Sequence, residues 1–166
     1  FGPMMANRDV VLFLVGIQGI LLGGASEELK NDKEIVLTAV KQDGIGTALS
    51  FASEELQNDQ EIVLAAVRRN GIALSFASLE LRNNKEIVLE AVKHDATHLK
   101  YASHAVRNTK EVILEAMKHN SIAFTYASPE LHDDKEFVME AMKQDVEACI
   151  RYVTDTWMRD ADVALQ

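Results

Sequence analysis

The sequence is poor in residues that crosslink chains or interrupt helices. Cys149 is the single cysteine, so the chain can form neither an internal disulfide framework nor a zinc knuckle. A nucleophilic role for its thiol would need a positioned base that the sequence does not identify, and we expect Cys149 to be buried. Only two prolines and eight glycines occur among the 166 residues, so little prevents most of the chain from being helical.

Long apolar runs and an excess of positive charge are also missing. The most apolar stretch, residues 10–22, is interrupted by Gln18 and is shorter than the about 20 residues that a helix needs to span a bilayer. No basic leader precedes it, which argues against a cleaved signal. The formal net charge of −9 opposes nonspecific attraction to nucleic acid. We therefore expect no transmembrane span and no nucleic-acid partner.

What the sequence does contain is a repeat. A Lys-Glu or Gln-Glu step followed by three apolar residues recurs at intervals of 27, 25, 25 and 25 residues. The steps begin at Lys33, Gln60, Lys85, Lys110 and Lys135. The longest interval contains two extra residues, near residues 44–47. Self-similarity at a short fixed period is typical of a solenoid, whose units bury surface only against their neighbours.

Each unit predicts two short helices. An Asn or Asp three residues before a Glu is a capping-box pattern, which predicts the start of the longer helix. Ser128 before Pro129 predicts a fresh helical turn after each Ala-Ser pair, because Ser caps helices and Pro fits the first helical position. The capping pairs are Asn31/Glu34, Asn58/Glu61, Asn83/Glu86, Asn108/Glu111 and Asp133/Glu136.

We therefore predict an all-α fold, an αα-solenoid of about 25-residue helical-pair repeats. The whole chain, residues 1–166, is predicted to be one helical repeat domain. A partial unit covers residues 8–24, the repeats cover about 25–145, and a C-terminal partial or capping unit covers 146–166. Apolar positions span roughly 200° of the longer helix, so we expect each such helix to be sandwiched between two others.

Two rows of residues follow from this register. Phe51, Phe76, Tyr101 and Tyr126 form an aromatic row, which we interpret as a core ladder; a base-stacking or ligand platform is the alternative. Basic residues also share one position, in the last turn of the longer helix, where cations suit the helix dipole. Acidic neighbours dilute their charge, so we interpret the basic row as structural. Its members are Lys41, Arg68, Lys93, Lys118 and Lys143.

The residue pattern of the units resembles a known family. The stretch that starts at Ala48 reads Ala-Leu-Ser-Phe-Ala-Ser-Glu-Glu-Leu-Gln-Asn-Asp-Gln-Glu-Ile-Val-Leu-Ala-Ala-Val-Arg-Arg-Asn-Gly. Over about residues 25–145 this pattern is similar to the tandem repeats of domain of unknown function 4116 (DUF4116). That family includes arrays from bacteria that secrete effectors, so the resemblance leaves both a reducing internal compartment and secretion open. It implies no catalytic residue, no cofactor and no settled activity.

Sites for chemistry are weakly indicated. The glycine-rich residues 16–24 lack both the Gly-Lys-Ser/Thr ending of a phosphate loop and a dinucleotide fingerprint. His98 stands where Ala73 and Ala123 stand in other units, which predicts either a helix start tilted towards solvent or a metal, proton-sensitive or partner contact. We predict no catalytic, cofactor or metal residues. An enzyme with a site at His98 or Cys149 is the rival hypothesis.

The first unit departs most from the pattern. Phe13, Gly16 and Ile17 stand where other units carry polar residues, so the polar face of this helix is missing. We expect the helix to be covered on both faces, by a partner, a second copy of the chain or a missing domain. Contact with a membrane complex is the alternative.

The repeat therefore predicts a non-enzymatic protein-interaction or scaffold module that presents an extended helical surface to a protein partner, with a homo-oligomer or larger complex left open. The second hypothesis is a structural subunit of a larger, membrane-associated assembly, docked through the apolar N-terminal helix. The candidate partner contacts are residues at variable or repeat-breaking positions: Phe13, Gly16, Ile17, Glu90, His98, Lys100, Glu115, Glu140 and Trp157.

Overall fold

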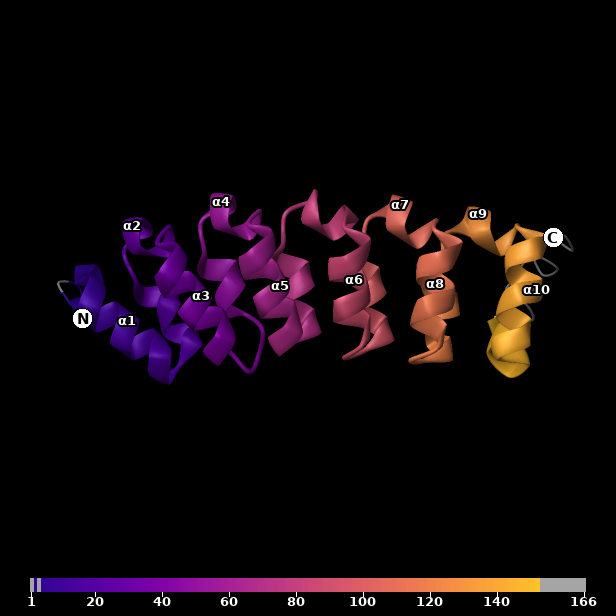
Figure 1. Cartoon of the computed structure of the whole chain (residues 1–166), viewed down its shortest axis with the longest axis horizontal. Helices are drawn as coiled ribbons and strands as arrows, with labels where there is room; N and C mark the ends of the chain where they lie inside the picture. The colour runs from indigo at the N-terminus through magenta and orange to yellow at the C-terminus, as the bar shows by residue number, and fades with distance from the viewer. Residues whose placement is uncertain (1, 3, 153–166) are drawn as a thin grey trace, which may run out of the picture.

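The computed structural model describes residue 2 and residues 4–152. The described chain is an elongated stack in which each helical unit lies beside the next, from the N-terminal to the C-terminal end (Figure 1). Its regular elements are α-helices and 3₁₀-helices, and the described ranges contain no strand. The predicted all-α solenoid is confirmed. Among the described residues, no helix is both long enough and apolar enough to cross a membrane.

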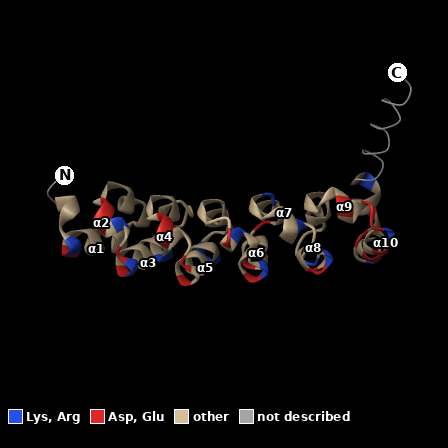
Figure 2. Cartoon of the chain, turned by 90° about the horizontal axis from the view of Figure 1, so that it is seen from above, with Lys and Arg blue, Asp and Glu red and all other residues tan. Residues whose placement is uncertain are grey.

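The longer α-helices form one layer of the stack (Figure 2). In α3 the buried residues are Ile35, Val36, Ala39 and Val40, and the same four positions are buried in α5 and α6. Each of these helices therefore buries a stripe between two neighbours, as the apolar pattern predicts. The layer consists of α1 (Arg8–Ile17), α3 (Lys33–Gln42), α5 (Gln60–Arg69), α6 (Lys85–Val92), α8 (Lys110–Met117) and α10 (Lys135–Gln144).

The second predicted helix of each unit is a 3₁₀-helix rather than an α-helix. At about 2.0 Å per residue a six-residue 3₁₀-helix is about 12 Å long, which equals an eight-residue α-helix at about 1.5 Å per residue. The α-helix and the 3₁₀-helix of a 25-residue unit can therefore have similar lengths, although the 3₁₀-helix contains fewer residues. These elements are η2 (Gly19–Gly24), η3 (Ala48–Phe51), η4 (Gly71–Phe76), η6 (Ala96–Tyr101) and η7 (Ser121–Tyr126).

A third, very short helix follows each Ala-Ser pair, as predicted, and these turns line the upper edge of the stack in Figure 1. The Ser128 hydroxyl accepts a hydrogen bond from the Leu131 amide, and the serine of each earlier unit caps its helix in the same way. The short elements are α2 (Glu27–Lys30), α4 (Glu54–Gln57), η5 (Leu81–Asn83), α7 (His104–Arg107) and α9 (Pro129–His132), and η1 (Met4–Ala6) precedes α1.

The capping residues of the longer helices lie one position later than the capping-box pattern predicts. Asp59 is the N-cap of α5, and its carboxylate accepts from the amides of Glu61 and Ile62. Asp32, Asn84 and Asp134 cap α3, α6 and α10 in the same way. At four of the five predicted positions, the side-chain oxygen of the preceding Asn instead accepts a hydrogen bond from the next unit.

That Asn forms part of a hydrogen-bonded ladder between units. The Ser78 hydroxyl donates to the side-chain oxygen of Asn58 over 2.5 Å, and the Ser78 amide donates to the Gln57 carbonyl over 3.0 Å. The ladder fixes each unit against the one before it and uses the Asn oxygen that a capping box would need. The same side-chain pair occurs as Ser53 with Asn31, Ser103 with Asn83 and Ser128 with Asn108.

The aromatic row has the predicted register but lies at the edge of the core. Phe51, Phe76, Tyr101 and Tyr126 are half-buried and pack against the fully buried cluster. Each is the last residue of its 3₁₀-helix, just before the chain leaves that layer, so one side of the ring stays accessible. The fully buried cluster itself is made mostly of aliphatic side chains.

The two-residue insertion forms a loop between α3 and η3, and this loop extends beyond the lower edge of the stack in Figure 1. The buried Asp43 carboxylate accepts hydrogen bonds from the amides of Ile45 and Ala48. Gly46 has a φ of 83°, which favours glycine. The Asn70 side-chain amide donates to the Gly44 carbonyl over 3.1 Å and so ties the loop to the end of α5.

Candidate functional site

The outward side of the longer α-helices differs between units, and we call it the outer α face. It comprises the three positions of each helix that correspond to Phe13, Gly16 and Ile17 of α1. Their side chains are exposed or half-buried throughout the described units. Figure 2 shows that Lys, Arg, Asp and Glu occur frequently on this layer. Its character changes along the stack in three steps.

On α1 the outer α face is apolar. The exposed fractions of the Phe13 and Ile17 side chains are 69 % and 66 %. Gly16 between them is also exposed, and a Cβ added there would meet no atom within 4 Å. As the sequence predicts, this face of α1 has no polar side chains. It forms an exposed apolar surface, and nothing in the described chain covers it.

On α3 and α5 the outer α face is cationic. Lys41 of α3 and Arg68 and Arg69 of α5 surround the half-buried Ala65, and together they line a cavity of about 330 Å³. All three cations are exposed, and none forms an ion pair with another described residue. We call this feature the cationic pocket.

On α6 and α8 acids neutralise the same row. The Lys93 ammonium donates to the Glu90 carboxylate over 2.7 Å, and this bond holds the pKa of Glu90 below its usual value. Lys118 pairs with Glu115 in the same way and likewise lowers the pKa of that carboxyl. A cavity of about 280 Å³ lies between the two helices, beside His119. This part of the outer α face offers paired charges rather than free ones.

The other candidate contacts have varied settings. Glu140 of α10 is exposed. The exposed Lys100 ammonium lies 4.9 Å from the centroid of the Tyr101 ring, a cation–π contact within its own 3₁₀-helix. Trp157 lies outside the described residues. Whether these residues contact a partner stays a prediction.

His98 has a packing role in the structure. The side chain is half-buried, and its Nδ1 lies 3.1 Å from the Ala91 carbonyl oxygen, which fits a donated hydrogen bond. The ring occupies the space above Gly71, where an added Cβ would come within 2.5 Å of Nδ1. His98 is therefore bound to α6 and packed against Gly71 of the unit before it rather than tilted freely towards solvent.

Two other histidines also contact backbone carbonyls, and one of these contacts crosses units. The imidazole of His94 contacts the Arg68 carbonyl at the end of α5 over 3.1 Å, and His132 contacts the Phe124 carbonyl over 2.8 Å. His104 lies 3.3 Å from the Glu130 carboxylate. Within residues 4–152, no group of three or more His, Cys, Asp or Glu side chains has the arrangement of a metal site.

Cys149 is fully buried, as expected from the sequence. Burial, with a smaller contribution from the Asp145 carboxylate, raises the pKa of the thiol to about 11. Because the thiolate is the nucleophilic form, a protonated, inaccessible thiol is a poor catalyst near neutral pH.

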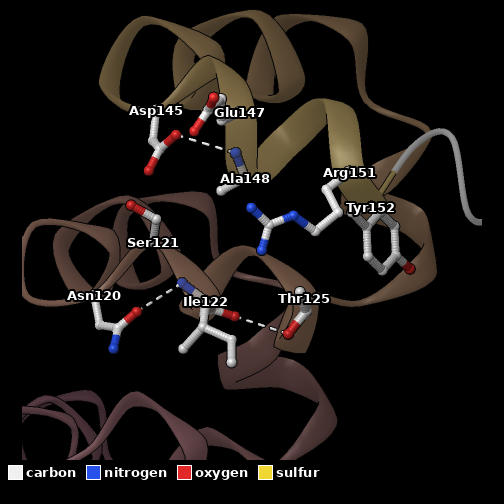
Figure 3. Close-up of a pocket in the computed structure, with 9 residues that line it drawn as sticks. All are labelled: Asn120, Ser121, Ile122, Thr125, Asp145, Glu147, Ala148, Arg151 and Tyr152. Carbon is white, nitrogen blue, oxygen red and sulfur yellow. Dashed lines mark hydrogen bonds between the residues drawn. The ribbon is translucent and has the colours of Figure 1, made fainter.

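Two further cavities lie near the ends of the stack. One, of about 460 Å³, lies beside Asp145, Arg151 and Tyr152, with the Arg151 guanidinium pointing into it (Figure 3). The Ser121 hydroxyl is the main cause that lowers the pKa of Asp145, which also accepts from the Ala148 amide over 3.0 Å.

The other cavity lies at the N-terminal end and is apolar, with a volume of about 470 Å³. It opens where Gly24 replaces the aromatic residue of the other units, and the Phe51 ring forms one wall. A Cβ added to Gly23 would approach that ring to 3.0 Å. Leu14 and Ile20 line the cavity as well, so it extends the apolar character of this end.

Sequence reasoning overlooked the cationic pocket. The basic row that contains Lys41 and Arg68 is predicted from the sequence to be structural, suited to the helix dipole and diluted by acidic neighbours, and Arg69 is not part of that row. The signal was present, because Thr38 and Ala65 stand where Glu90 and Glu115 neutralise the same row in later units. That Arg69 closes the same cavity from the following position required the structure.

One family model matches the chain. The model of the domain of unknown function DUF4116 matches five overlapping segments, residues 7–57, 45–82, 59–107, 84–132 and 109–158. No curated protein and no solved structure matches the chain. The last three matches begin 25 residues apart, which is the period of the repeat, and each of them spans about two units of the fold.

Proposed function

We propose that this chain, which belongs to the DUF4116 family, is a non-enzymatic protein-interaction module. In this proposal the solenoid is a rigid support, and the outer α face presents unit-specific side chains to a protein partner. Extended solenoid surfaces suit this task because each unit adds one strip of contact area.

The observation that carries the proposal is the contrast between repeated and variable positions. Core residues, serine caps and the Asn-Ser ladder recur from unit to unit, which accounts for them structurally. The outer α face instead changes from apolar to cationic to charge-paired. Because stability does not require this change, recognition is the simplest reason for it.

The state of the candidate reactive groups supports the non-enzymatic part. Cys149 is buried with a raised pKa, and His98 is engaged by the Ala91 carbonyl. Neither group is among the residues that line the cavities described above.

Site-specific photocrosslinking tests the proposal. A photoreactive amino acid would replace Phe13, Ala65 or Glu140 on the outer α face, and Glu54 or Glu130 on the short helices as exposed controls. After irradiation in extract of the native source, we expect adducts of one defined mass from the outer α face and none from the controls. Equal labelling at all five positions, or none at any, would contradict the proposal.

A second candidate function is a subunit of a larger assembly that docks through α1. The observation that favours it is the exposed Phe13 and Ile17 pair beside the apolar cavity. Light scattering of the purified chain and of a Phe13→Ser, Ile17→Ser variant tests self-association. A larger mass that the two substitutions abolish supports docking between copies, whereas a monomer that binds anionic vesicles through these residues supports a membrane-associated assembly.

A further inference from the structure

We propose that the cationic pocket binds carboxylate side chains from an acidic segment of a partner protein. The inference rests on the proposed interaction function and deepens it, because it names the chemistry of one part of the outer α face. The pocket offers three cations from two adjacent helices around a cavity of about 330 Å³.

The lack of internal partners is the first step of the argument. In α6 and α8 an acid three residues earlier pairs with the basic residue of the row, as Glu90 does with Lys93. In α3 that position is Thr38, whose hydroxyl donates to the Glu34 carbonyl of its own helix. In α5 it is Ala65, which has no polar group. The cations of these two helices are therefore left for an external anion.

The space in the cationic pocket also depends on Ala65 standing where α6 and α8 have a glutamate. Ala65 forms its wall, whereas a glutamate at this position would both neutralise Arg68 and fill the cavity. The charge and the room for a ligand are therefore consequences of one substitution in the repeat.

The third cation is placed where the repeat is broken. Arg69 stands where other units carry Gln42, His94 or His119, and its guanidinium lies beside the inserted loop. A Cβ built on Gly44 would be 3.7 Å from the Arg69 Nη2, and Asn70 ties the same loop to α5. The insertion and the additional arginine thus converge on one site.

The electrostatic balance favours an anion. The C-terminal ends of α3 and α5 each contribute about −0.5 of a charge, so three full cations leave roughly +2. Two acids oppose this balance. Glu90 lies within electrostatic range of Arg68 but is bound to Lys93. The buried Asp43 carboxylate at the end of α3 accepts hydrogen bonds from two backbone amides.

Carboxylates match the donors that are present. An arginine guanidinium can bind a carboxylate through two parallel hydrogen bonds, and lysine adds a compact charge. An acidic peptide fits the local site, whereas a long polyanion would also meet the field of a chain with a net charge of −9. We therefore commit to an acidic protein segment rather than nucleic acid.

Fluorescence anisotropy with a labelled polyglutamate peptide at low ionic strength tests the inference. We expect saturable binding that weakens with salt, and a loss of at least about tenfold in affinity for the Arg68→Glu, Arg69→Glu variant, because repulsion replaces two charge-assisted contacts. The matched control is Lys85→Glu, Lys135→Glu, which makes the same change of charge at exposed cations that form no ion pair with described residues. It should alter affinity by less than about threefold, because Lys85 and Lys135 are the first residues of α6 and α10, at the opposite helix end from the pocket, and make no direct contact with a carboxylate bound there.

The variant Ala65→Glu keeps all three cations and imitates α6. It should weaken peptide binding about as much as the double arginine variant, while circular dichroism and thermal unfolding verify the fold. No binding of the peptide, an equal loss in the Lys85 and Lys135 control, or tighter binding of a mixed-sequence RNA would each overturn the inference. Outer-face crosslinks that persist in the arginine variant would show that the proposed function stands even if the pocket chemistry does not.

Discussion

The α3–α5 and α6–α8 regions share one backbone plan and present different surfaces. Both bury the same helix positions, and both carry a basic residue at the helix end, in the last turn of α3 and α5 and at the C-cap of α6 and α8. In the first region Lys41 and Arg68 are unpaired, and in the second Lys93 and Lys118 are held by acids of their own helices. One acidic residue per unit therefore separates a surface that can attract an anion from one that cannot, without changing the fold.

The largest expected effect concerns what the two regions have in common. Leu49 and Leu99 occupy the same position of η3 and η6, and both are fully buried. Changing either to Ala should lower the free energy of unfolding by about 2–5 kcal/mol, because transfer and cavity terms add. Urea unfolding followed by circular dichroism measures this. If only one variant is destabilised, the cores of the two regions are not equivalent.

A smaller effect is expected at the helix starts, where the regions differ. Asp59 caps α5, whereas Thr109 before α8 makes no capping bond and donates instead to the Ala105 carbonyl. Thr109→Asp should therefore stabilise the chain by about 0.5–1 kcal/mol, and Asp59→Thr should destabilise it by about as much. Thermal unfolding of both variants provides the reciprocal control. A Thr109→Asp variant no more stable than the parent would contradict this account of the cap.

The third comparison concerns the short-helix residue whose side chain binds a backbone carbonyl of the preceding 3₁₀-helix. Gln57 donates to the Leu49 carbonyl, and His132 fills this role for Phe124 at the other end, where it also stacks against Tyr152. Burial lowers the pKa of His132 from its usual 6.5. The unfolded chain therefore binds this proton more readily, so stability should fall as pH decreases from about 6.5 towards the lower folded pKa.

The variant His132→Gln imitates Gln57 and removes the titrating group. The decrease in unfolding free energy between pH 6.5 and pH 5, measured in urea, should be smaller in this variant, and carboxylates are still ionised in most of that window. An unchanged slope would assign the pH dependence to other histidines.

The smallest effect is expected for a variant that gives the α6–α8 region an unpaired cation like those of the α3–α5 region. Glu90→Ala releases Lys93 and gives α6 the arrangement of α5. Binding of the polyglutamate peptide should increase by about two- to threefold, because one exposed cation is gained in a partly screened setting. Glu86→Ala, which removes an exposed acid that is not paired with Lys93, is the matched control. An equal increase in both would mean that net charge alone matters.

Much of the fold followed from spacing. The Lys-Glu steps placed the longer helices, the Ala-Ser pairs placed the short ones, and the buried stripe of α3 is the one that its apolar pattern predicts. The caps were misplaced by one residue because a sequence does not state which of two neighbouring polar residues, such as Asn58 and Asp59, is bound by the next unit. The 3₁₀ geometry was missed because local periodicity over six residues barely separates it from an α-helix.

By itself, the sequence determined the period, the all-helical class and the core, because each unit repeats the same apolar positions and must bury them against its neighbours. It also determined which basic residues have an acid of their own helix beside them, since residues three apart meet on one helix face. The tertiary structure alone decided that Asn58 binds Ser78, and that Lys41, Arg68 and Arg69 line one open surface pocket. Those contacts join residues about one unit or more apart, and they depend on the distance and rotation between stacked helices, which no local pattern specifies.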